Sequence, residues 1–339
     1  MTQIYLAFDG GLAVLQPRNG HWTPTLSLMG KDCHCLAVDP HRPRRVYCGA
    51  FDAGLWQSDD AGASWQPVAG ELPHQEVMAV AVSPLEEVNG AGVVWAGTEP
   101  SALFRSEDEG RTWQEQPALQ TLPSKPTWSF PPRPWTHHVR WIEPDATVAD
   151  RIFVGIELGG VMRSLDGGQT WEDRKPGSQH DCHTLRTHPL APGLIYEAAG
   201  GGFAESHDGG ATWQGDDRGR SHHYLWGLAV DPADPATVVV SASPGPGAAH
   251  NNQYAQATLY RRSNGSTWQP VQTGLPAPQG TRAYVLATNP AEPGVFYAAT
   301  RSDLYRSPDA GVSWERLSIA WPAGVRFSTV NAMVVAETE

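Results

Sequence analysis

Five near-identical stretches of eight residues, each ending in tryptophan, divide this chain into similar units. They share the pattern Ser-x-Asp-x-Gly-x-Ser/Thr-Trp and occupy 58–65, 106–113, 164–171, 206–213 and 307–314. Two shorter versions keep the glycine and the tryptophan, at 263–268 and 19–22. The intervals between the seven tryptophans are 43, 48, 58, 42, 55 and 46 residues. A repeat of this length in a chain with β-type patterning predicts a propeller or an array of repeats.

The chemistry of the repeated stretch is that of a tight turn between two strands. Its aspartate can accept hydrogen bonds from backbone N–H groups, and its glycine adopts backbone angles that other residues avoid. The serine and threonine hydroxyls can satisfy the remaining polar groups. The tryptophan opens the following strand and offers a large apolar surface to a neighbouring sheet. The repeat is therefore expected to be structural.

The stretches resemble the Asp-box, or BNR, repeat of the sialidase-like β-propellers, and their copies span nearly the whole chain. The resemblance implies a propeller whose boxes lie on the face away from the active site. That superfamily includes sialidases and other glycoside hydrolases, and also non-enzymatic assembly factors and receptor ectodomains. The Phe/Tyr-Arg-Ile-Pro motif of sialidases is absent from this sequence. Seven-bladed polysaccharide lyases carry histidine and tyrosine, or a histidine-bound metal, at the axis.

Each unit is expected to form four strands, because period-two runs alternate with clusters of Pro, Gly and Asp. The N-terminal unit lacks an innermost strand: 4–9, 12–16 and the stretch at Trp22 supply only the outer three. The segment 329–335 can provide the missing one. We therefore predict an all-β fold, a single seven-bladed β-propeller over 1–339, closed by N- and C-terminal strands in one blade. Closure removes the free edges of the sheets.

Composition narrows the classes of partner. The net charge of -12 disfavours nucleic acid and anionic membranes, since both attract basic surfaces. The N-terminal residues form neither a basic segment nor a long apolar stretch, so no signal peptide or membrane span is expected. Four cysteines are too few for a disulfide framework in 339 residues. The cytoplasm is the expected compartment.

Two insertions interrupt the repeat, Ala118–Thr136 and Pro244–Ala257. The predicted strand order places both on the face opposite the Asp boxes, and insertions on one face of a repeat ring often mark the binding face. The first insertion carries Trp128, Phe130 and Trp135. Loops that only cover the ring are the alternative. Aromatic side chains left in water are unfavourable, which favours a binding role.

Aligning the units on the proline after each innermost strand brings together the residues that open these strands. Six residues before the proline stand His34, Met78, His138, His183, Trp226 and Tyr284, with Asn331 as the seventh. These residues are expected to ring the mouth of the channel on the insertion face. Loops of the same face add charged residues: Asp9, Asp52, Glu99, Glu157, Arg282, Arg301 and Asp303. Arg140 follows His138 closely, and Glu157 is its candidate partner.

Three interpretations of the histidines remain open. His34, His138 and His183 could bind one divalent transition metal and leave an open position for a ligand. The site could instead perform acid–base catalysis without a metal. In that case the candidate catalytic residues are His138, Glu157, Tyr284 and His183. The histidines could also simply line a hydrated channel.

We expect the protein to bind a small polar ligand, a sugar or a uronic acid derivative, in a histidine-lined pocket on the insertion face. The candidate ligand-binding residues are His34, Asp52, Glu99, Trp226, Arg282, Arg301 and Trp135. Chemistry of the glycoside hydrolase or polysaccharide lyase type is expected there. The alternatives are a histidine-ligated metalloenzyme and a non-catalytic scaffold propeller, whose partner would be another protein.

Overall fold

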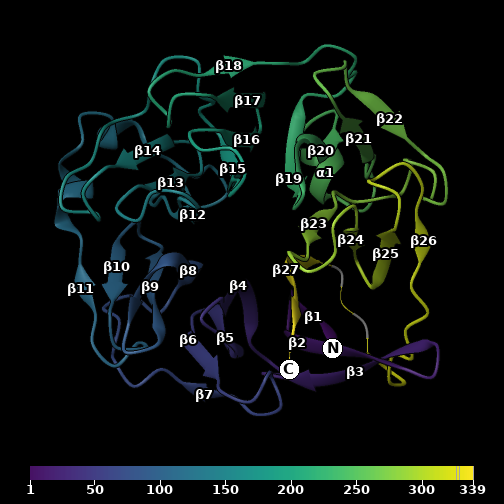
Figure 1. The fold of residues 1–339 in the computed structure, drawn as a ribbon, viewed down its shortest axis with the longest axis horizontal. Coiled ribbons are helices and arrows are strands. Elements are labelled where there is room, and N and C mark those ends of the chain that lie inside the picture. The colour runs from purple at the N-terminus through teal and green to yellow at the C-terminus, as the bar shows by residue number, and fades with distance from the viewer. Residues whose placement is uncertain (326, 328, 339) are drawn as a thin grey trace.

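The first and last strands of the chain pair with each other and complete a ring of seven sheets (Figure 1). The computed structural model describes residues 1–325, 327 and 329–338. In it, β27 (Val330–Glu337) lies antiparallel to β1 (Thr2–Phe8), with Ile4 opposite Val335. The N-terminal ammonium group also lies 2.8 Å from the Glu337 carboxylate. The predicted all-β propeller of seven blades, closed by both termini, is confirmed.

The strands of each blade are antiparallel and are ordered from the central channel outward. Blade 1 comprises β27, β1, β2 (Gly11–Arg18) and β3 (His21–Ser27). Blade 2 comprises β4 (Asp32–Asp39), β5 (Arg42–Phe51), β6 (Gly54–Ser58) and β7 (Gln66–Pro67). Blade 3 comprises β8 (Val77–Val88), β9 (Ala91–Thr98), β10 (Leu103–Ser106) and β11 (Gln114–Glu115). Blade 4 comprises β12 (Val139–Pro144), β13 (Ile152–Ile156) and β14 (Gly160–Ser164). Blade 5 comprises β15 (Cys182–Thr187), β16 (Ile195–Ala199), β17 (Gly202–Ser206) and β18 (Gln214–Gly215). Blade 6 comprises β19 (Tyr224–Asp231), β20 (Asp234–Ser243), β21 (Thr258–Arg262) and β22 (Gln269–Val271). Blade 7 comprises β23 (Val285–Thr288), β24 (Phe296–Thr300), β25 (Asp303–Ser307) and β26 (Glu315–Arg316).

Blade 4 departs from the expected four strands. Its outermost strand is reduced to a single bridge between Arg163 and Glu172. The following residue, Asp173, turns the chain away, because its carboxylate accepts hydrogen bonds from the backbone N–H groups of Arg174 and Ser124, each at 2.8 Å. The segment is thereby tied to the first insertion instead of extending the sheet.

The five full repeat turns form the same set of hydrogen bonds. In the turn 164–171, the Ser164 hydroxyl accepts from the Gly168 N–H at 2.8 Å. The Asp166 carboxylate accepts from the Thr170 N–H at 2.8 Å and from its hydroxyl at 2.6 Å. Gly168 has a φ of 90°, which favours glycine. The equivalent aspartates, Asp60, Asp108, Asp208 and Asp309, accept from the corresponding N–H groups. The repeat is a self-satisfied turn.

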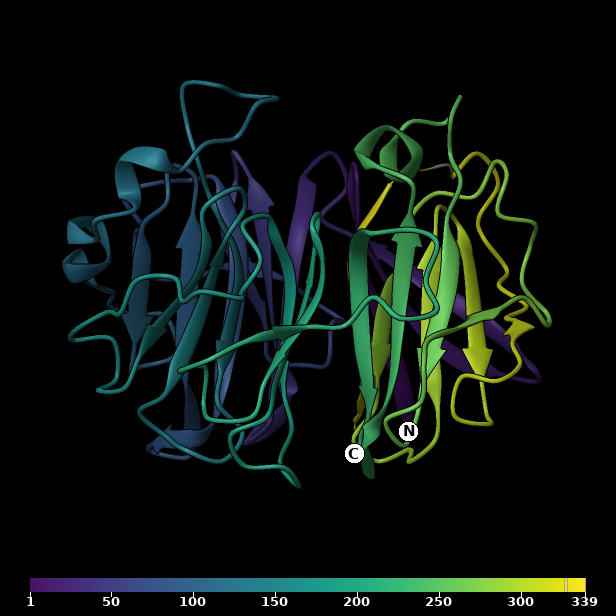
Figure 2. The same cartoon turned by 90° about the horizontal axis from the view of Figure 1, so that it is seen from above.

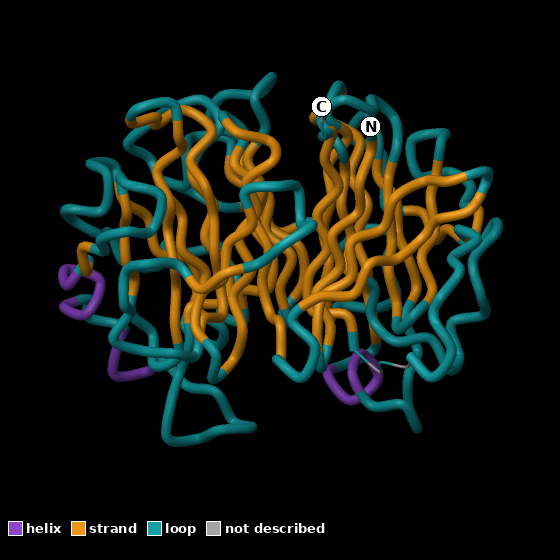
Figure 3. Tube along the Cα trace, turned by 90° about the horizontal axis from the view of Figure 1, so that it is seen from below, coloured by secondary structure: helices purple, strands orange, loops and turns teal. Residues whose placement is uncertain are grey.

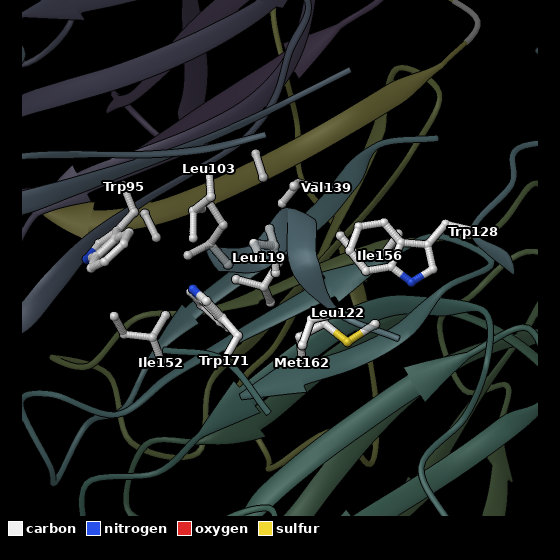
Figure 4. Close-up of a cluster of buried hydrophobic side chains, with 14 of the residues drawn as sticks. Trp95, Leu103, Leu119, Leu122, Trp128, Val139, Ile152, Ile156, Met162 and Trp171 are labelled. Carbon is white, nitrogen blue, oxygen red and sulfur yellow. The ribbon is translucent and has the colours of Figure 1, made fainter. Parts of the chain in front are cut away.

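Apolar side chains fill the space between adjacent blades. Figure 4 shows one such cluster, in which Trp95 of blade 3 and Trp171 beside blade 4 are both buried. The first insertion contributes Leu119 and Trp128 to this cluster, and Trp128 is only 5% exposed. Its indole N–H donates to the Ser124 hydroxyl at 3.0 Å. Trp128 therefore anchors the insertion in the core and does not line a binding surface.

Both insertions lie at the same end of the ring, as expected (Figures 2 and 3). The first contains the short helices η1 (Pro117–Thr121) and η2 (Lys125–Thr127), and the second contains α1 (Pro246–His250). The two termini lie at the other end, to which the antiparallel order also assigns the repeat turns. No helix among the described residues is long and apolar enough to cross a membrane.

We predict that Asp166→Ala lowers the free energy of unfolding by about 1–2 kcal/mol, because it removes the acceptor for three hydrogen bonds, one from Ser164 and two from Thr170, and leaves their donors without it. Denaturant unfolding followed by tryptophan fluorescence measures this change. Activity and ligand binding at the insertion face should be unchanged. A variant that lost ligand binding at wild-type stability would contradict the structural role of the turn.

Candidate functional site

Six of the seven innermost strands carry a bulge near their start, where one or two residues fall out of register with the neighbouring strand. The out-of-register residues include His34, Met78, Arg140, His183, Trp226 and Asn331. All of these except His183 line a central cavity of about 350 Å³. In five of the blades the bulge thus directs a side chain into the central cavity.

The proline-based alignment is wrong by two residues in blade 4. It placed His138 at the height of His34, but the strand pairing gives that position to Arg140. Val139 pairs with Ile156 and Trp141 with Gly155, so the bulge falls between them. The reason is that β12 is shorter between its bulge and its closing proline. His138 therefore lies at the rim of the site, just before the strand.

His138 is 1% exposed and lies between two carboxylates. Its Nε2 is 3.0 Å from Glu157 Oε2, and its Nδ1 is 3.3 Å from Glu99 Oε2. The first insertion completes the surroundings. Phe130 meets the His138 ring edge-on with 4.7 Å between ring centroids, and Arg133 Nε donates to Glu99 Oε1 at 2.5 Å. Positive and negative groups alternate through the site, so each buried charge has a partner.

These ion pairs determine which groups are charged. Burial favours a raised pKa for Glu99, but hydrogen bonds from His138 and Arg133 outweigh it and lower the pKa to about 2. Burial also favours a raised pKa for Glu157, but the hydrogen bond from His138 and the nearby His183 outweigh it and lower the pKa to about 2. Burial works against the charged form of His138, yet its bonds to Glu157 and Glu99 raise its pKa. The arrangement holds two carboxylates around a histidine that favours the protonated form.

His183 is fully buried on the other side of Glu157. Its Nδ1 lies 2.6 Å from the carbonyl oxygen of Leu225, which can only accept, so Nδ1 carries the proton. Its Nε2 has no hydrogen-bond partner within the described part of the chain and lies 3.5 Å from Asp181 Oδ1. One donor atom each of Glu157, Asp181 and His183 lie within 4.8 Å of one another. We call Glu99, His138, Glu157, Asp181 and His183 the mouth cluster.

His34 stands apart from the mouth cluster, although it was predicted to share a metal with His138 and His183. Its Nε2 is 3.1 Å from Asp32 Oδ2, and its ring contacts Phe51 with 5.8 Å between centroids. His34 lines the central cavity, whereas His138 and His183 do not. The structure thus brings His138 and His183 to Glu157 and leaves His34 within blade 2.

Tyr284, predicted to be catalytic, lies in the apolar layer between blades 6 and 7. It is 1% exposed and packs against Tyr305 with 6.3 Å between ring centroids. Burial raises its pKa, which disfavours a phenolate. Two of the predicted ligand-binding residues are instead open to solvent: Asp52 is exposed at the β5–β6 turn, and Trp135 is 80% exposed. None of Tyr284, Asp52 and Trp135 therefore belongs to the mouth cluster.

The predicted arginines hold the second insertion in place. Arg282 donates to the Thr329 hydroxyl at 2.9 Å and also to the backbone carbonyl of His250. Arg301 donates to the Asn252 side-chain oxygen at 2.8 Å. Both arginines therefore position the loop that carries His250 above the mouth.

Trp226 is the aromatic residue that forms a wall of the site. It lines the central cavity, and the Arg140 guanidinium lies over its ring at 4.5 Å from the centroid. The His183 ring is 4.8 Å away on one side and the His250 ring 4.3 Å away on another. Burial and the neighbouring His183 lower the pKa of His250 to about 4, so His250 is neutral near pH 7. An indole in this position can stack on the face of a sugar ring.

Arg133 and Asp181 belong to the site but were not among the predicted site residues. Arg133 was overlooked because only the aromatic residues of the first insertion were weighed. Asp181 lies in the tripeptide Asp-Cys-His, which occurs at 32–34 and again at 181–183. That repeated tripeptide was the available signal for Asp181.

We predict that the stabilisation contributed by Glu99, His138 and Glu157 is greatest between about pH 4.5 and 6.5. The two carboxylates have pKa values lowered from 4.5, so their contribution is lost as pH falls below that value. His138 has a pKa raised from 6.5, so its contribution is complete below pH 6.5 and is lost as pH rises through the raised value. Urea unfolding of wild type and His138→Gln, from well below pH 4.5 to well above pH 6.5, measures the difference on both sides of this range. A difference that does not change with pH would contradict the charged arrangement.

Comparisons with known proteins find sequence similarity to xyloglucanases and solved structures of the same fold. No protein-family model matches the chain. A probable oligoxyloglucan-reducing end-specific xyloglucanase of Neosartorya fischeri is 24% identical over 263 residues, which cover 74% of this chain but only 28% of that protein. The GH74 enzyme of Niastella koreensis superposes with a TM-score of 0.68 at 18% identity, over 92% of this chain and 52% of that one. YCF48 bound to D1 peptide superposes with a TM-score of 0.58 at 16% identity, over 93% of this chain and 85% of that one. The chain is thus a seven-bladed β-propeller with xyloglucanase-like and GH74-like neighbours.

Proposed function

We propose that this propeller binds a carbohydrate at the insertion-face mouth of its channel and acts on it by hydrolase- or lyase-type chemistry. The observation that carries the proposal is the mouth cluster, in which Glu157 and Asp181 approach each other beside the Trp226 indole. Carboxylates bind sugar hydroxyls, and the chemistry of glycosidic bonds commonly uses a pair of them. The similarity in sequence to xyloglucanases supports the same class of ligand.

The roles of the residues follow from their exposure and charge. Glu157 and Asp181 have side chains 13% and 21% exposed, so they are the groups that can contact a ligand. Glu157 is ionised at neutral pH because its pKa is about 2, which suits a base better than a general acid. His138 is buried against Glu157 and acts as a positioning residue. Its partners Glu99 and Arg133 hold it in place.

The second candidate is a non-catalytic scaffold whose partner is a protein. The observation that favours it is the likeness in fold to YCF48, whose structure is bound to D1 peptide and superposes over 93% of this chain. Trp135, at 80% exposure on the first insertion, would then be a contact residue for the partner. The two candidates differ in whether the buried charges at the mouth matter for binding.

We predict that the protein binds xyloglucan oligosaccharides or oligogalacturonides, and that Asp181→Asn and Glu157→Gln each weaken this binding by about tenfold or more, as expected for a buried charged contact. Isothermal titration calorimetry measures the affinity. Release of reducing ends reports hydrolysis, and ultraviolet absorbance of an unsaturated product reports lyase activity.

Asp166→Ala, at the opposite end of the propeller, is the control for general loss of stability. No binding of any tested saccharide, together with capture of a peptide or protein that depends on Trp135, would favour the scaffold. Binding that is indifferent to both carboxylate variants would overturn the proposed site.

A further inference from the structure

We propose that Glu157, Asp181 and His183 form a binding site for one divalent transition-metal ion at the mouth of the channel. The three residues come from the end of β13, the start of β15 and the loop before it, and one donor atom from each lies within 4.8 Å of the others. The proposal does not depend on the carbohydrate assignment, because metal binding can be measured in the absence of any sugar.

The protonation of His183 is the observation that points to a cation. Nδ1 carries the proton, since it faces the Leu225 carbonyl at 2.6 Å. Nε2 faces Asp181 Oδ1 at 3.5 Å in a fully buried position and makes no hydrogen bond to any described residue. Either a second proton or a metal ion must lie between them. A histidine that donates its other N–H to a backbone carbonyl is the usual arrangement of a metal ligand.

The rest of the surroundings holds the three ligands in place. The His183 ring is fixed between Tyr224 and Trp226, with centroids 5.0 and 4.8 Å away. Glu157 is oriented by the His138 hydrogen bond at 3.0 Å. It stays ionised at neutral pH because that bond holds its pKa near 2. Arg140, 3.7 Å from Glu157, and His138, 3.0 Å from it, offset the charge of that carboxylate, so Asp181 is the ligand that offers its charge to a cation.

Blade 2 provides an internal comparison, since it repeats the Asp-Cys-His tripeptide at the same bulge. There the His34 Nε2 is hydrogen-bonded to Asp32 at 3.1 Å and is not left without a partner. The residue of the preceding blade that corresponds to Glu157 is Asp9, whose carboxylate accepts from the Thr329 N–H at 3.1 Å. The same tripeptide therefore yields a three-ligand set only in blade 5, where a carboxylate from blade 4 faces the histidine.

The donor set fits a first-row metal. One imidazole nitrogen and two carboxylate oxygens suit Zn²⁺, Mn²⁺ or Co²⁺. Distances of about 2.0–2.2 Å from ligands to metal require the donor atoms, now up to 4.8 Å apart, to move closer together when the ion binds. Three protein ligands leave a coordination position for water or for a ligand oxygen.

The test is a titration of chelator-treated wild-type protein with Co²⁺, followed by its visible absorption, and with Zn²⁺ by calorimetry. We expect one equivalent to bind, with Zn²⁺ displacing Co²⁺. Asp181→Asn and His183→Gln should weaken binding at least about tenfold, a loss that results even from disturbing supporting residues of a metal site. Gly200→Ala should act in the same direction without removing a ligand, because a Cβ there would lie 2.0 Å from Asp181 Oδ2.

His188→Gln is the matched control. His188 is also buried in blade 5, but its Nε2 faces the Asp231 carbonyl at 2.8 Å and its Nδ1 accepts from the Leu190 N–H at 3.2 Å. This variant should bind the metal as the wild type does, and its unfolding curve controls for lost stability. The proposal is overturned if no equivalent binds, if Asp181→Asn and Gly200→Ala bind normally, or if His34→Gln abolishes binding. The proposal is likewise overturned if NMR shows that both ring nitrogens of His183 carry protons and that its signals do not change when Zn²⁺ is added. The contact with Asp181 would then be a simple ion pair.

Discussion

The pairing of β1 with β27 is the interaction on which the rest of the structure depends. Each blade buries its two faces only against its neighbours, so the ring has no stable open form in which every core is covered. Blade 1 packs on blade 7 through Ile4, Leu6 and Met333, and on blade 2 through Tyr5 and Val14. Without β27, these apolar faces and the edge of β1 would meet water. The closure therefore fixes the bore of the channel and, with it, the distance across which residues of different blades meet.

The fold could be predicted because its signal is local and repeated. Each turn satisfies its own polar groups, as Asp166 does, so the sequence pattern needs no distant partner to be recognised. The exceptions depend on tertiary contacts. The outer strand of blade 4 is diverted where Asp173 accepts a hydrogen bond from the Ser124 N–H of the first insertion, and Trp128 enters the core between blades 3 and 4. Neither contact has a counterpart in the other units, so the repeat could not reveal it.

The candidate site could be predicted only in part, because a bulge leaves no mark in the sequence. His138 and Glu157 were both expected among the catalytic residues, and they lie 3.0 Å apart. The predicted position of His138 along the channel axis was wrong, because the bulge of blade 4 lies two residues closer to the closing proline than in blade 2. The environment of His183 depends on the Leu225 carbonyl of the next blade and on Glu157 of the previous one. Such contacts between blades are set by the geometry of the ring and not by spacing along the chain.

The bulges of the innermost strands have a consequence for how a propeller can change over evolution. A residue in a bulge does not take part in the ladder of hydrogen bonds, so its replacement leaves the pairing of the blade intact. Here those positions hold residues as different as His34, Met78, Arg140, Trp226 and Asn331 around one cavity. The ring thus separates the residues that maintain the architecture from a small set that is free to vary. New chemistry can arise at the centre of the molecule, one blade at a time, without a new fold.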